Sequence, residues 1–321
     1  MSRKKDLQVK IKRAFLFAFG LVFFLIPGQN EYLVVQAFYL PPQTRQLEFN
    51  LPMAPYPVNL ASVQAPKTSA RSVLVVDLDS AVVLHAENEN AWVLPASTVK
   101  IMTALVSFDN YALDEILVVG KVSHLGQDME LLEGEEILVE SLLYGLLVSS
   151  ANDAALVLTQ NYPGGEKAFI EKMNLKAQEL YLNHTYFANP TGLDSDPNGN
   201  LLADYSYTTS LDLARLADWA LKNPVFAKMV ATPEIIVTDI SGKIKHRLFN
   251  INILLASQPE IKGIKTGWTE EAGECLVSLV ERNGKKIIIV VLGSQDRFGE
   301  TIKLIDWIFA NHRWINLAPS I

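Results

Sequence analysis

The chain has 321 residues, 49% of them apolar, so it is long enough to fold as one large domain or two small ones around a substantial core. Its formal net charge is −7, although the first 13 residues carry six cations against one anion. The remainder holds 22 cations and 34 anions. Such an acidic body argues against nucleic-acid binding, which requires a basic face.

The first 40 residues have the layout of an export signal. A basic tip precedes thirteen unbroken apolar or glycine residues, 14–26, and Pro27-Gly28 ends the run. The run is shorter than the roughly 20 residues of a membrane-spanning helix. We predict a secreted or periplasmic protein, or one anchored at the outer face of the bacterial cytoplasmic membrane. Cleavage of the segment, for which Val35-Gln36-Ala37 is a candidate site, is left open by the sequence.

Residues 41–70 are rich in proline and show no hydrophobic periodicity, which predicts an extended linker. A globular body is expected at 71–315. If the N-terminal segment is retained, the linker holds this body away from the membrane.

Strands are predicted at both ends of the body. Ser72–Asp77 and Ala81–His85 are apolar runs on either side of a turn. Later in the chain, the runs 274–281 and 286–292 flank Asn283-Gly284, a dipeptide typical of a type I′ hairpin turn. Both pairs are therefore expected to be antiparallel.

Helices are predicted between these strands. One begins at Ser97, and another, at 141–148, is apolar on nearly every side, as a central helix would be. Residues 166–182 form an amphipathic helix, and a further helix begins with Ser210 as its N-cap. The inner face of the amphipathic helix is assigned to Phe169, Ile170, Met173, Leu175, Ala177 and Leu180.

This order of elements, completed by a helix at 300–311, predicts an α+β fold. An antiparallel sheet is built from both ends of the body and covered by helices. A largely helical insertion separates the two parts of the sheet.

The chain has a single cysteine, Cys275, so no intrachain disulfide forms. Cys275 stands in an apolar run that predicts a strand, and we interpret it as a small buried hydrophobe rather than a nucleophile. The five histidines are scattered, and none has the spacing of a metal site.

Ser97-Thr98-Val99-Lys100 places a serine three residues before a lysine. In a helix these two side chains share a face. Lys100 accepts the serine proton only when neutral, and moving its pKa from about 10.4 to near 7 requires roughly 3 to 5 kcal/mol of desolvation and neighbouring positive charge. By itself, the motif fits both a nucleophile with its base and the first turn of an ordinary helix.

Ser150-Ala151-Asn152 is the only Ser-x-Asn sequence in the chain and falls in a predicted break between apolar helices. A serine and an amide in such a break need hydrogen-bond partners. Both residue types are common where helices are interrupted, so this motif alone favours an ordinary break.

Lys265-Thr266-Gly267 precedes the Cys275 strand and is itself a candidate strand. The lysine and threonine offer a charge and a hydroxyl to a carboxylate, and glycine lets a ligand approach the backbone. Taken alone, the motif is equally a surface strand with a turn.

The order of the three motifs changes this balance. Ser-x-x-Lys, Ser-x-Asn and Lys-Thr-Gly follow one another at separations of 53 and 115 residues, at a helix start, a helix break and a strand. This is the set described for active-site serine enzymes that interact with penicillin. We therefore predict Ser97 as the nucleophile.

Longer stretches extend the comparison: PASTVKIMTAL, LLYGLLVSSANDAA, NPTGLD, IKGIKTGWTEEAGECLVS and VVLGSQDR. From about Ser72 to Trp307 the chain resembles the serine-type D-alanyl-D-alanine carboxypeptidases, the low-molecular-mass penicillin-binding proteins. The resemblance implies a five-stranded antiparallel sheet with helices. Many members add a second, all-β domain, which this chain is expected to lack because too few residues follow Lys265.

The resemblance also implies roles for the site residues. Ser97 attacks the carbonyl of the D-Ala-D-Ala bond with Lys100 as its base. Ser150 relays a proton to the leaving D-alanine, and Asn152 holds the substrate amide. An acyl-enzyme forms and water hydrolyses it, without a metal ion or an organic cofactor. The residues assigned to substrate binding are Lys265, Thr266, Gly267, Trp268 and Arg297.

The partners that the resemblance implies are peptidoglycan stem peptides ending in D-Ala-D-Ala, with β-lactams as acylating inhibitors. Three rival functions stay open. A D,D-endopeptidase would cleave peptidoglycan cross-links with the same residues. A β-lactamase would need a deacylating glutamate, for which Glu179 in Glu179-Leu-Tyr-Leu-Asn183 is a candidate. A non-catalytic wall-binding protein would be expected to have lost at least one motif.

Overall fold

The computed structural model describes Lys10, Lys12 and residues 55–122, 124, 126–194 and 205–316. The predicted export segment lies outside the described residues, apart from the two lysines, and stays a prediction. Among the described helices, none is both long and apolar enough to cross a membrane.

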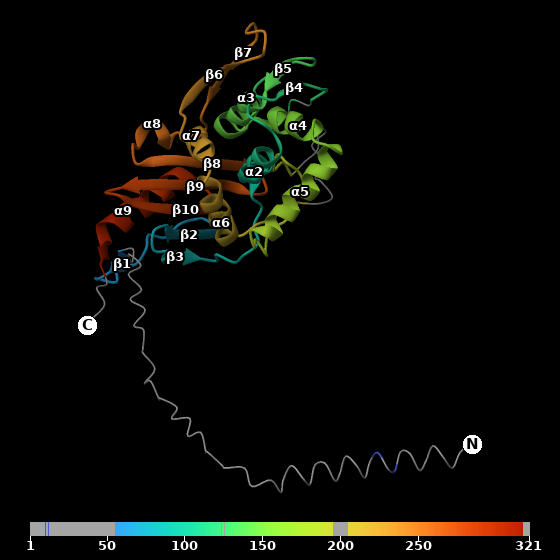
Figure 1. The fold of residues 1–321 in the computed structure, drawn as a ribbon. Helices are drawn as coiled ribbons and strands as arrows, with labels where there is room; N and C mark the ends of the chain where they lie inside the picture. Colours follow the sequence, from blue (N-terminus) through green and yellow to red (C-terminus); the bar gives the residue numbers. More distant parts are fainter. Residues whose placement is uncertain are drawn as a thin grey trace, which may run out of the picture. The chain divides into compact units, whose positions relative to one another are not determined.

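A five-stranded antiparallel sheet forms the centre of the described body, as predicted (Figure 1). The strand order is β3-β2-β10-β9-β8, so the two ends of the body meet where β2 pairs with β10. The five strands are β2 (Ser72–Asp77), β3 (Val83–Glu87), β8 (Ile261–Thr269), β9 (Gly273–Arg282) and β10 (Lys285–Ser294).

The two predicted hairpins are present, with strand boundaries shifted by one or two residues. Asn283 and Gly284 join β9 to β10 with φ angles of 53° and 71°, the positive values that a type I′ turn requires. The β2–β3 turn continues through Ala81, whose φ is 57°, so β3 begins at Val83 rather than at Ala81.

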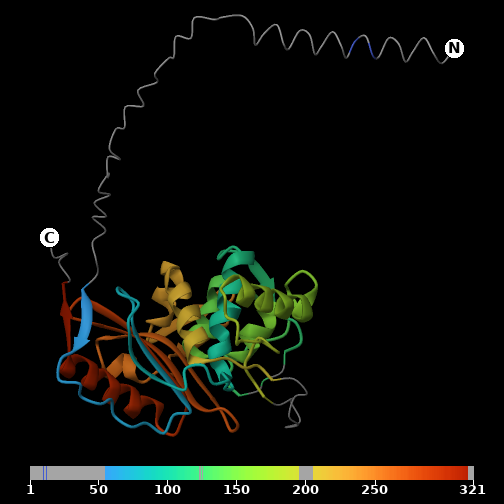
Figure 2. The ribbon, with the colours of Figure 1, turned by 90° about the horizontal axis from the view of Figure 1, so that it is seen from below.

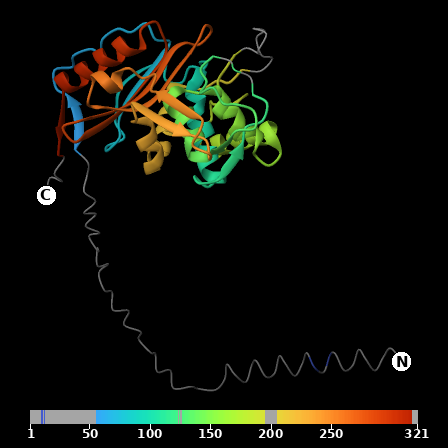
Figure 3. The same ribbon diagram turned by 90° about the horizontal axis from the view of Figure 1, so that it is seen from above.

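Both faces of the sheet are buried, which explains why β10 is apolar at every central position. Its alternate side chains Ile287, Ile289 and Val291 join a core with α9 (Arg297–Asn311). Those between them, Ile288, Val290 and Leu292, join the larger core formed with the helical insertion. Figures 2 and 3 show α9 along one face of the sheet and the insertion on the other.

The insertion contains most of the described helices. A short 3₁₀ helix (Ala96–Val99) leads into α2 (Lys100–Asn110), and a π-helical turn (Gly145–Ser149) follows α3 (Val139–Tyr144). The other helices are α4 (Asn152–Gln160), α5 (Gly165–Glu179), α6 (Ser210–Leu221), α7 (Pro224–Val230) and α8 (Leu254–Ser257).

Three small antiparallel sheets complete the described fold. They pair β1 (Tyr56–Asn59) with β11 (His312–Ile315), β4 (Ile116–Val118) with β5 (Glu136–Leu138), and β6 (Glu234–Thr238) with β7 (Lys245–Phe249). Because β1 is paired, part of the segment assigned to the linker belongs to the body.

Some helix predictions need correction. The N-cap of α6 is Thr209, whose hydroxyl accepts a hydrogen bond from the Asp212 amide, and Ser210 is already helical. On α5, Leu175 is 52% exposed, whereas Phe169 and Met173 are buried as expected. The closing helix α9 begins three residues earlier than 300, at Arg297.

Candidate active site

Ser97 lies in the 3₁₀ helix, wedged between β8 and the 189–194 loop. A Cβ atom on Gly267 of β8 would come within 3.0 Å of the Ser97 amide nitrogen. A Cβ atom on Gly192, whose φ is +79°, would overlap the carbonyl oxygen of Ala96. These two glycines therefore allow the strand and the loop to approach the backbone next to the serine.

Lys100, the first residue of α2, is fully buried and reaches three acceptors. Its Nζ lies 2.9 Å from Ser97 Oγ, 2.6 Å from Asn152 Oδ1 and 2.7 Å from the Thr191 carbonyl oxygen. A neutral amine has two hydrogens and one lone pair. If the hydrogens are donated to Asn152 and Thr191, the lone pair faces the Ser97 hydroxyl.

Burial lowers the pKa of Lys100 well below its ordinary value, and the positive charge of Lys265 lowers it further. The carboxylate of Asp153 acts in the opposite direction. A neutral lysine needs desolvation and a neighbouring positive charge. The fold supplies both.

The Ser150 motif occupies the predicted helix break. Ser150 adopts a left-handed conformation, with φ 62° and ψ 29°, at the end of the π-helical turn. Asn152 then begins α4, and its backbone N–H donates to the Gln127 carbonyl oxygen over 2.7 Å. The break brings the Ser150 side chain into a cavity shared with Ser97 and the Asn152 side chain to Lys100.

Lys265 lies in the middle of β8 rather than at its start, and it is 2% exposed. Its Nζ donates to the Thr266 carbonyl oxygen over 3.0 Å. Burial, together with the charge of Arg297, lowers the pKa of Lys265 to about 7. Thr266 and Gly267 line the cavity, and Trp268 stands at its edge with 61% of its surface exposed.

Arg297, the first residue of α9, reaches across the sheet to β8. Its Nη1 donates to the Gly267 carbonyl oxygen over 2.8 Å, and its backbone amide donates to Glu274 over 2.8 Å. Burial lowers the pKa of Arg297 from its ordinary value. The structure therefore brings together all of the predicted site residues around one cavity of about 750 Å³, with Lys100 and Lys265 buried beside it.

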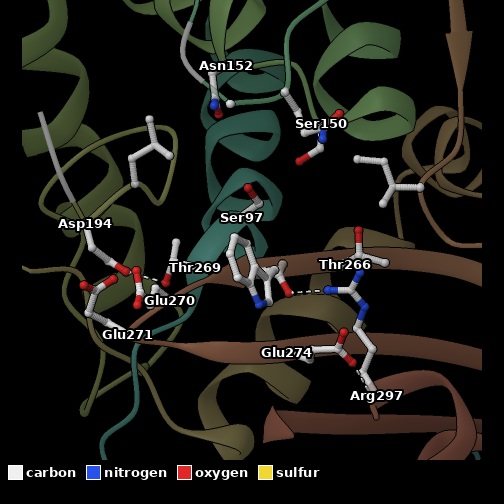
Figure 4. A pocket seen from close by; sticks show the side chains of 16 residues that line it. Ser97, Ser150, Asn152, Asp194, Thr266, Thr269, Glu270, Glu271, Glu274 and Arg297 are labelled. Atoms are coloured by element: carbon white, nitrogen blue, oxygen red, sulfur yellow. Dashed lines mark hydrogen bonds between the residues drawn. The ribbon is translucent and has the colours of Figure 1, made fainter. Parts of the chain in front are cut away.

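The cavity also contains acidic residues that the sequence reasoning missed. Figure 4 shows Asp194, Glu270 and Glu271 gathered on the opposite side of the cavity from Arg297. The Thr269 hydroxyl donates to Asp194 over 2.5 Å. The run Glu270-Glu271, two residues after Trp268, is the sequence signal that pointed to the two glutamates.

One group of side chains, His124, Asp128 and Asp153, brings possible metal-ligand atoms within 4.8 Å of one another. The Asp153 carboxylate already accepts hydrogen bonds from the backbone amides of Met129 and Leu131, at 3.0 Å each. Those bonds account for its burial without an ion, so we assign no metal site there.

The fold and this site, with a serine hydroxyl next to a buried lysine at the edge of a cavity, are those expected of a serine peptidase. Residues 59–296 match the family model described as D-alanyl-D-alanine carboxypeptidase. The chain belongs to this family of serine peptidases.

Individual relatives agree with the family match. The chain is 32% identical over 253 residues to D-alanyl-D-alanine carboxypeptidase DacF of Bacillus subtilis, covering 76% of this chain but only 63% of DacF. It is 34% identical over 245 residues to the D-alanyl-D-alanine endopeptidase of Pseudomonas aeruginosa, covering 74% and 76% of the two chains. The crystal structure of the Streptomyces K15 DD-transpeptidase is 30% identical, with a TM-score of 0.70, and covers 77% of this chain and 100% of its own.

Proposed function

We propose that this protein is a serine D,D-carboxypeptidase that removes the terminal D-alanine from peptidoglycan stem pentapeptides through an acyl-enzyme. The observation that carries the proposal is the 2.9 Å contact between Lys100 Nζ and Ser97 Oγ beside a cavity lined by Thr266 and Arg297. A nucleophile with its base at one end and a cationic side chain at the other fits a substrate that ends in a carboxylate.

In the acylation step, neutral Lys100 accepts the Ser97 proton while the serine oxygen attacks the penultimate D-alanine carbonyl. The negative oxygen that develops is assigned to the backbone amides of Ser97 and Trp268. Losing one such donor typically costs about 3 to 4 kcal/mol in the transition state.

Collapse of this intermediate breaks the carbon–nitrogen bond. Ser150, whose hydroxyl lines the cavity, passes a proton to the departing D-alanine nitrogen. The acyl group stays on Ser97 until a water molecule attacks the ester, which regenerates the serine and releases the shortened peptide.

The terminal carboxylate is assigned to Thr266 and Arg297, with the charge of Lys265 behind them. Arg297 Nε has no hydrogen-bond partner among the described residues and is buried. A buried guanidinium with an unused donor gains from an anionic ligand, because an unsatisfied polar group there is costly.

The test is release of free D-alanine from a stem pentapeptide ending in D-Ala-D-Ala, followed by mass spectrometry. The parent protein should release D-alanine, and Ser97→Ala should release none. Release by the Ser97→Ala variant would overturn the assignment of the nucleophile.

A D,D-endopeptidase is the second candidate, because relatives such as the Pseudomonas aeruginosa protein carry that name. If the folded protein is acylated by penicillin but leaves the pentapeptide intact, cleavage of a cross-linked stem-peptide dimer would establish this alternative. For a β-lactamase, the candidate glutamate is poorly placed. The Glu179 side chain is 55% exposed, lies 4.0 Å from Lys176, and does not line the cavity.

We also propose that the protein is exported and acts at the outer face of the cytoplasmic membrane or in the periplasm. The proposal is supported by the basic tip and apolar run at the N-terminus. Fractionation of cells that express the full chain, with N-terminal sequencing of the product, tests export and shows whether the segment is cleaved.

A further inference from the structure

Three aromatic rings outside the catalytic cavity form a stack. The rings of Trp92 and Tyr207 are 4.8 Å apart at an interplanar angle of 15°, and Tyr186 stacks on Tyr207 at 5.8 Å and 30°. Trp92 is 64% exposed and Tyr186 is 38% exposed. Because one face of Trp92 is covered by Tyr207, this exposure means that the opposite face is open.

Backbone pairing holds the stack in place. Tyr186 and Tyr207 lie opposite each other in an antiparallel bridge and exchange hydrogen bonds of 2.9 and 3.0 Å. Val93, next to Trp92, makes the same exchange with Thr208 at 2.9 Å in both directions. Exposed rings that are fixed in advance lose little conformational entropy when a ligand binds.

The stack continues into a shallow groove along α5, whose wall includes Tyr186. Glu171 and Gln178 also line this groove, and their side chains make no hydrogen bond or ion pair within the described part of the chain. An open ring face beside free carboxylate and amide groups suits a sugar. The C–H bonds of a pyranose pack on the electron-rich ring face, while its hydroxyl and acetamido groups donate to the polar side chains.

The stack lies within reach of the nucleophile. Ser97 is five positions after Trp92, which places the two at most roughly 18 Å apart even in a fully extended chain. The four residues of a pentapeptide stem that precede its terminal D-alanine reach at most roughly 14 Å. The segment from Trp92 to Ser97 is also shorter than its extended limit, because Ala96 already belongs to the 3₁₀ helix. When the terminal bond of the stem is at Ser97, the glycan end of the stem can therefore lie at the stack.

We propose that Trp92, Tyr207 and Tyr186 form a binding platform for the glycan strand of peptidoglycan, a polymer of N-acetylated amino sugars. The platform holds the strand while a stem peptide that branches from it enters the catalytic cavity. This inference takes the identity of the polymer from the proposed function, whereas glycan binding itself does not depend on catalysis.

The first test uses purified, dye-labelled glycan strands from which an amidase has removed the stem peptides. Binding to the full-length protein in detergent is measured by fluorescence anisotropy in a Ser97→Ala background. Trp92→Ala should weaken binding roughly fivefold, and Trp92→Tyr, which keeps a flat ring, should stay within about twofold of the parent. Trp219→Ala is the matched control, because Trp219 is 45% exposed on α6 and, among the described residues, contacts the ammonium group of Lys222 rather than another ring.

The second test compares D-alanine release from pentapeptides still attached to glycan strands with release from free pentapeptide. The ratio of the two rates should fall in Trp92→Ala and stay unchanged in Trp219→Ala. Equal glycan binding by the parent, Trp92→Ala and Trp219→Ala would overturn the platform, as would the absence of glycan binding by the parent. If the parent protein binds glycan but releases D-alanine from neither substrate, the proposed function is overturned and the platform is not.

Discussion

The proposed role of Lys100 as a base depends on how the fold destabilises its charged form. The side chain is fully buried, and Lys265 adds a second positive charge nearby. Its donors are directed to Asn152 and Thr191, so its position does not depend on the substrate. A nearby serine and lysine would have little chemical value without these surroundings.

The low pKa of Lys100 sets the acid limb of the acylation rate. The base is active when deprotonated, so we expect acylation to be lost as the pH falls through this lowered pKa. Lys100→Arg should slow penicillin acylation by about 10²- to 10⁴-fold, because arginine stays protonated. Stopped-flow acylation across a pH series measures both effects. Acylation of Lys100→Arg at the parent rate would contradict the role of the base.

We predict that Lys265 controls the alkaline limb. Its pKa of about 7 means that its charge, which is proposed to attract the substrate carboxylate from behind Thr266, is present below this pH and lost above it. We expect kcat/KM for the pentapeptide to fall as the pH rises through about 7. The fall in kcat should occur at higher pH, because a bound carboxylate stabilises the charged lysine. In Lys265→Arg, the fall of kcat/KM with rising pH should disappear. If it is unchanged, another group is responsible for it.

At the scale of elements, the site depends on how closely β8 approaches the 3₁₀ helix. Gly267→Ala would place a methyl group 3.0 Å from the Ser97 amide nitrogen and 3.1 Å from the Ala96 Cβ atom. The strand or the backbone at Ser97 must give by a few tenths of an ångström. We expect slower acylation, with a loss smaller than the roughly 10²-fold of a 1 Å misplacement.

The matched control for this strand is Gly120→Ala, whose new methyl group would meet only the end of the flexible Gln160 side chain. Gly120→Ala should keep the parent acylation rate. Circular dichroism and thermal unfolding confirm that both variants are folded. If Gly267→Ala is acylated as fast as Gly120→Ala, close packing at this strand is not required.

Most of the elements were predictable, because their signals are local. The Asn283-Gly284 turn fixed the β9–β10 hairpin, and apolar runs marked the strands around it. The errors arose where tertiary structure decides. The amphipathic pattern on α5 assigned Leu175 to the core, yet it is exposed, and the cap of α6 moved from Ser210 to Thr209.

At the scale of the whole molecule, the sheet brings residues that are far apart in sequence to one cavity. The motifs predicted Ser97, Lys100 and Lys265, because each combination of residue types carries a recognisable chemistry. The Thr191 carbonyl and the Asp194 carboxylate were not predictable from local pattern. Their roles arise only when the 189–194 loop packs against α2 and β8.

The distribution of charge also belongs to this scale. Asp194, Glu270 and Glu271 line one side of the cavity, and on the other side Arg297 lies next to Glu274, on a chain with a net charge of −7. Penicillins with an anionic side chain should therefore acylate more slowly than those with an ammonium group. The difference should shrink between about 0.01 and 0.15 M salt, as the Debye length falls from roughly 30 to 8 Å.

Glu271→Gln should reduce this difference, and the exposed, distant control Glu133→Gln should not. Acylation rates for a matched pair of penicillins at two salt concentrations provide the measurement. If the difference in acylation rate between the two penicillins changes neither with salt nor in Glu271→Gln, the acidic side of the cavity does not act on the ligand.

The central claim is that Ser97 is the nucleophile and that the buried Lys100 activates it. It is tested most directly by treating the full-length protein with penicillin and mapping the covalent adduct by mass spectrometry of its peptides. We predict one adduct, on the peptide that contains Ser97, which disappears in Ser97→Ala and forms slowly in Lys100→Arg. An adduct on Ser150, or one that persists in Ser97→Ala, would contradict the account.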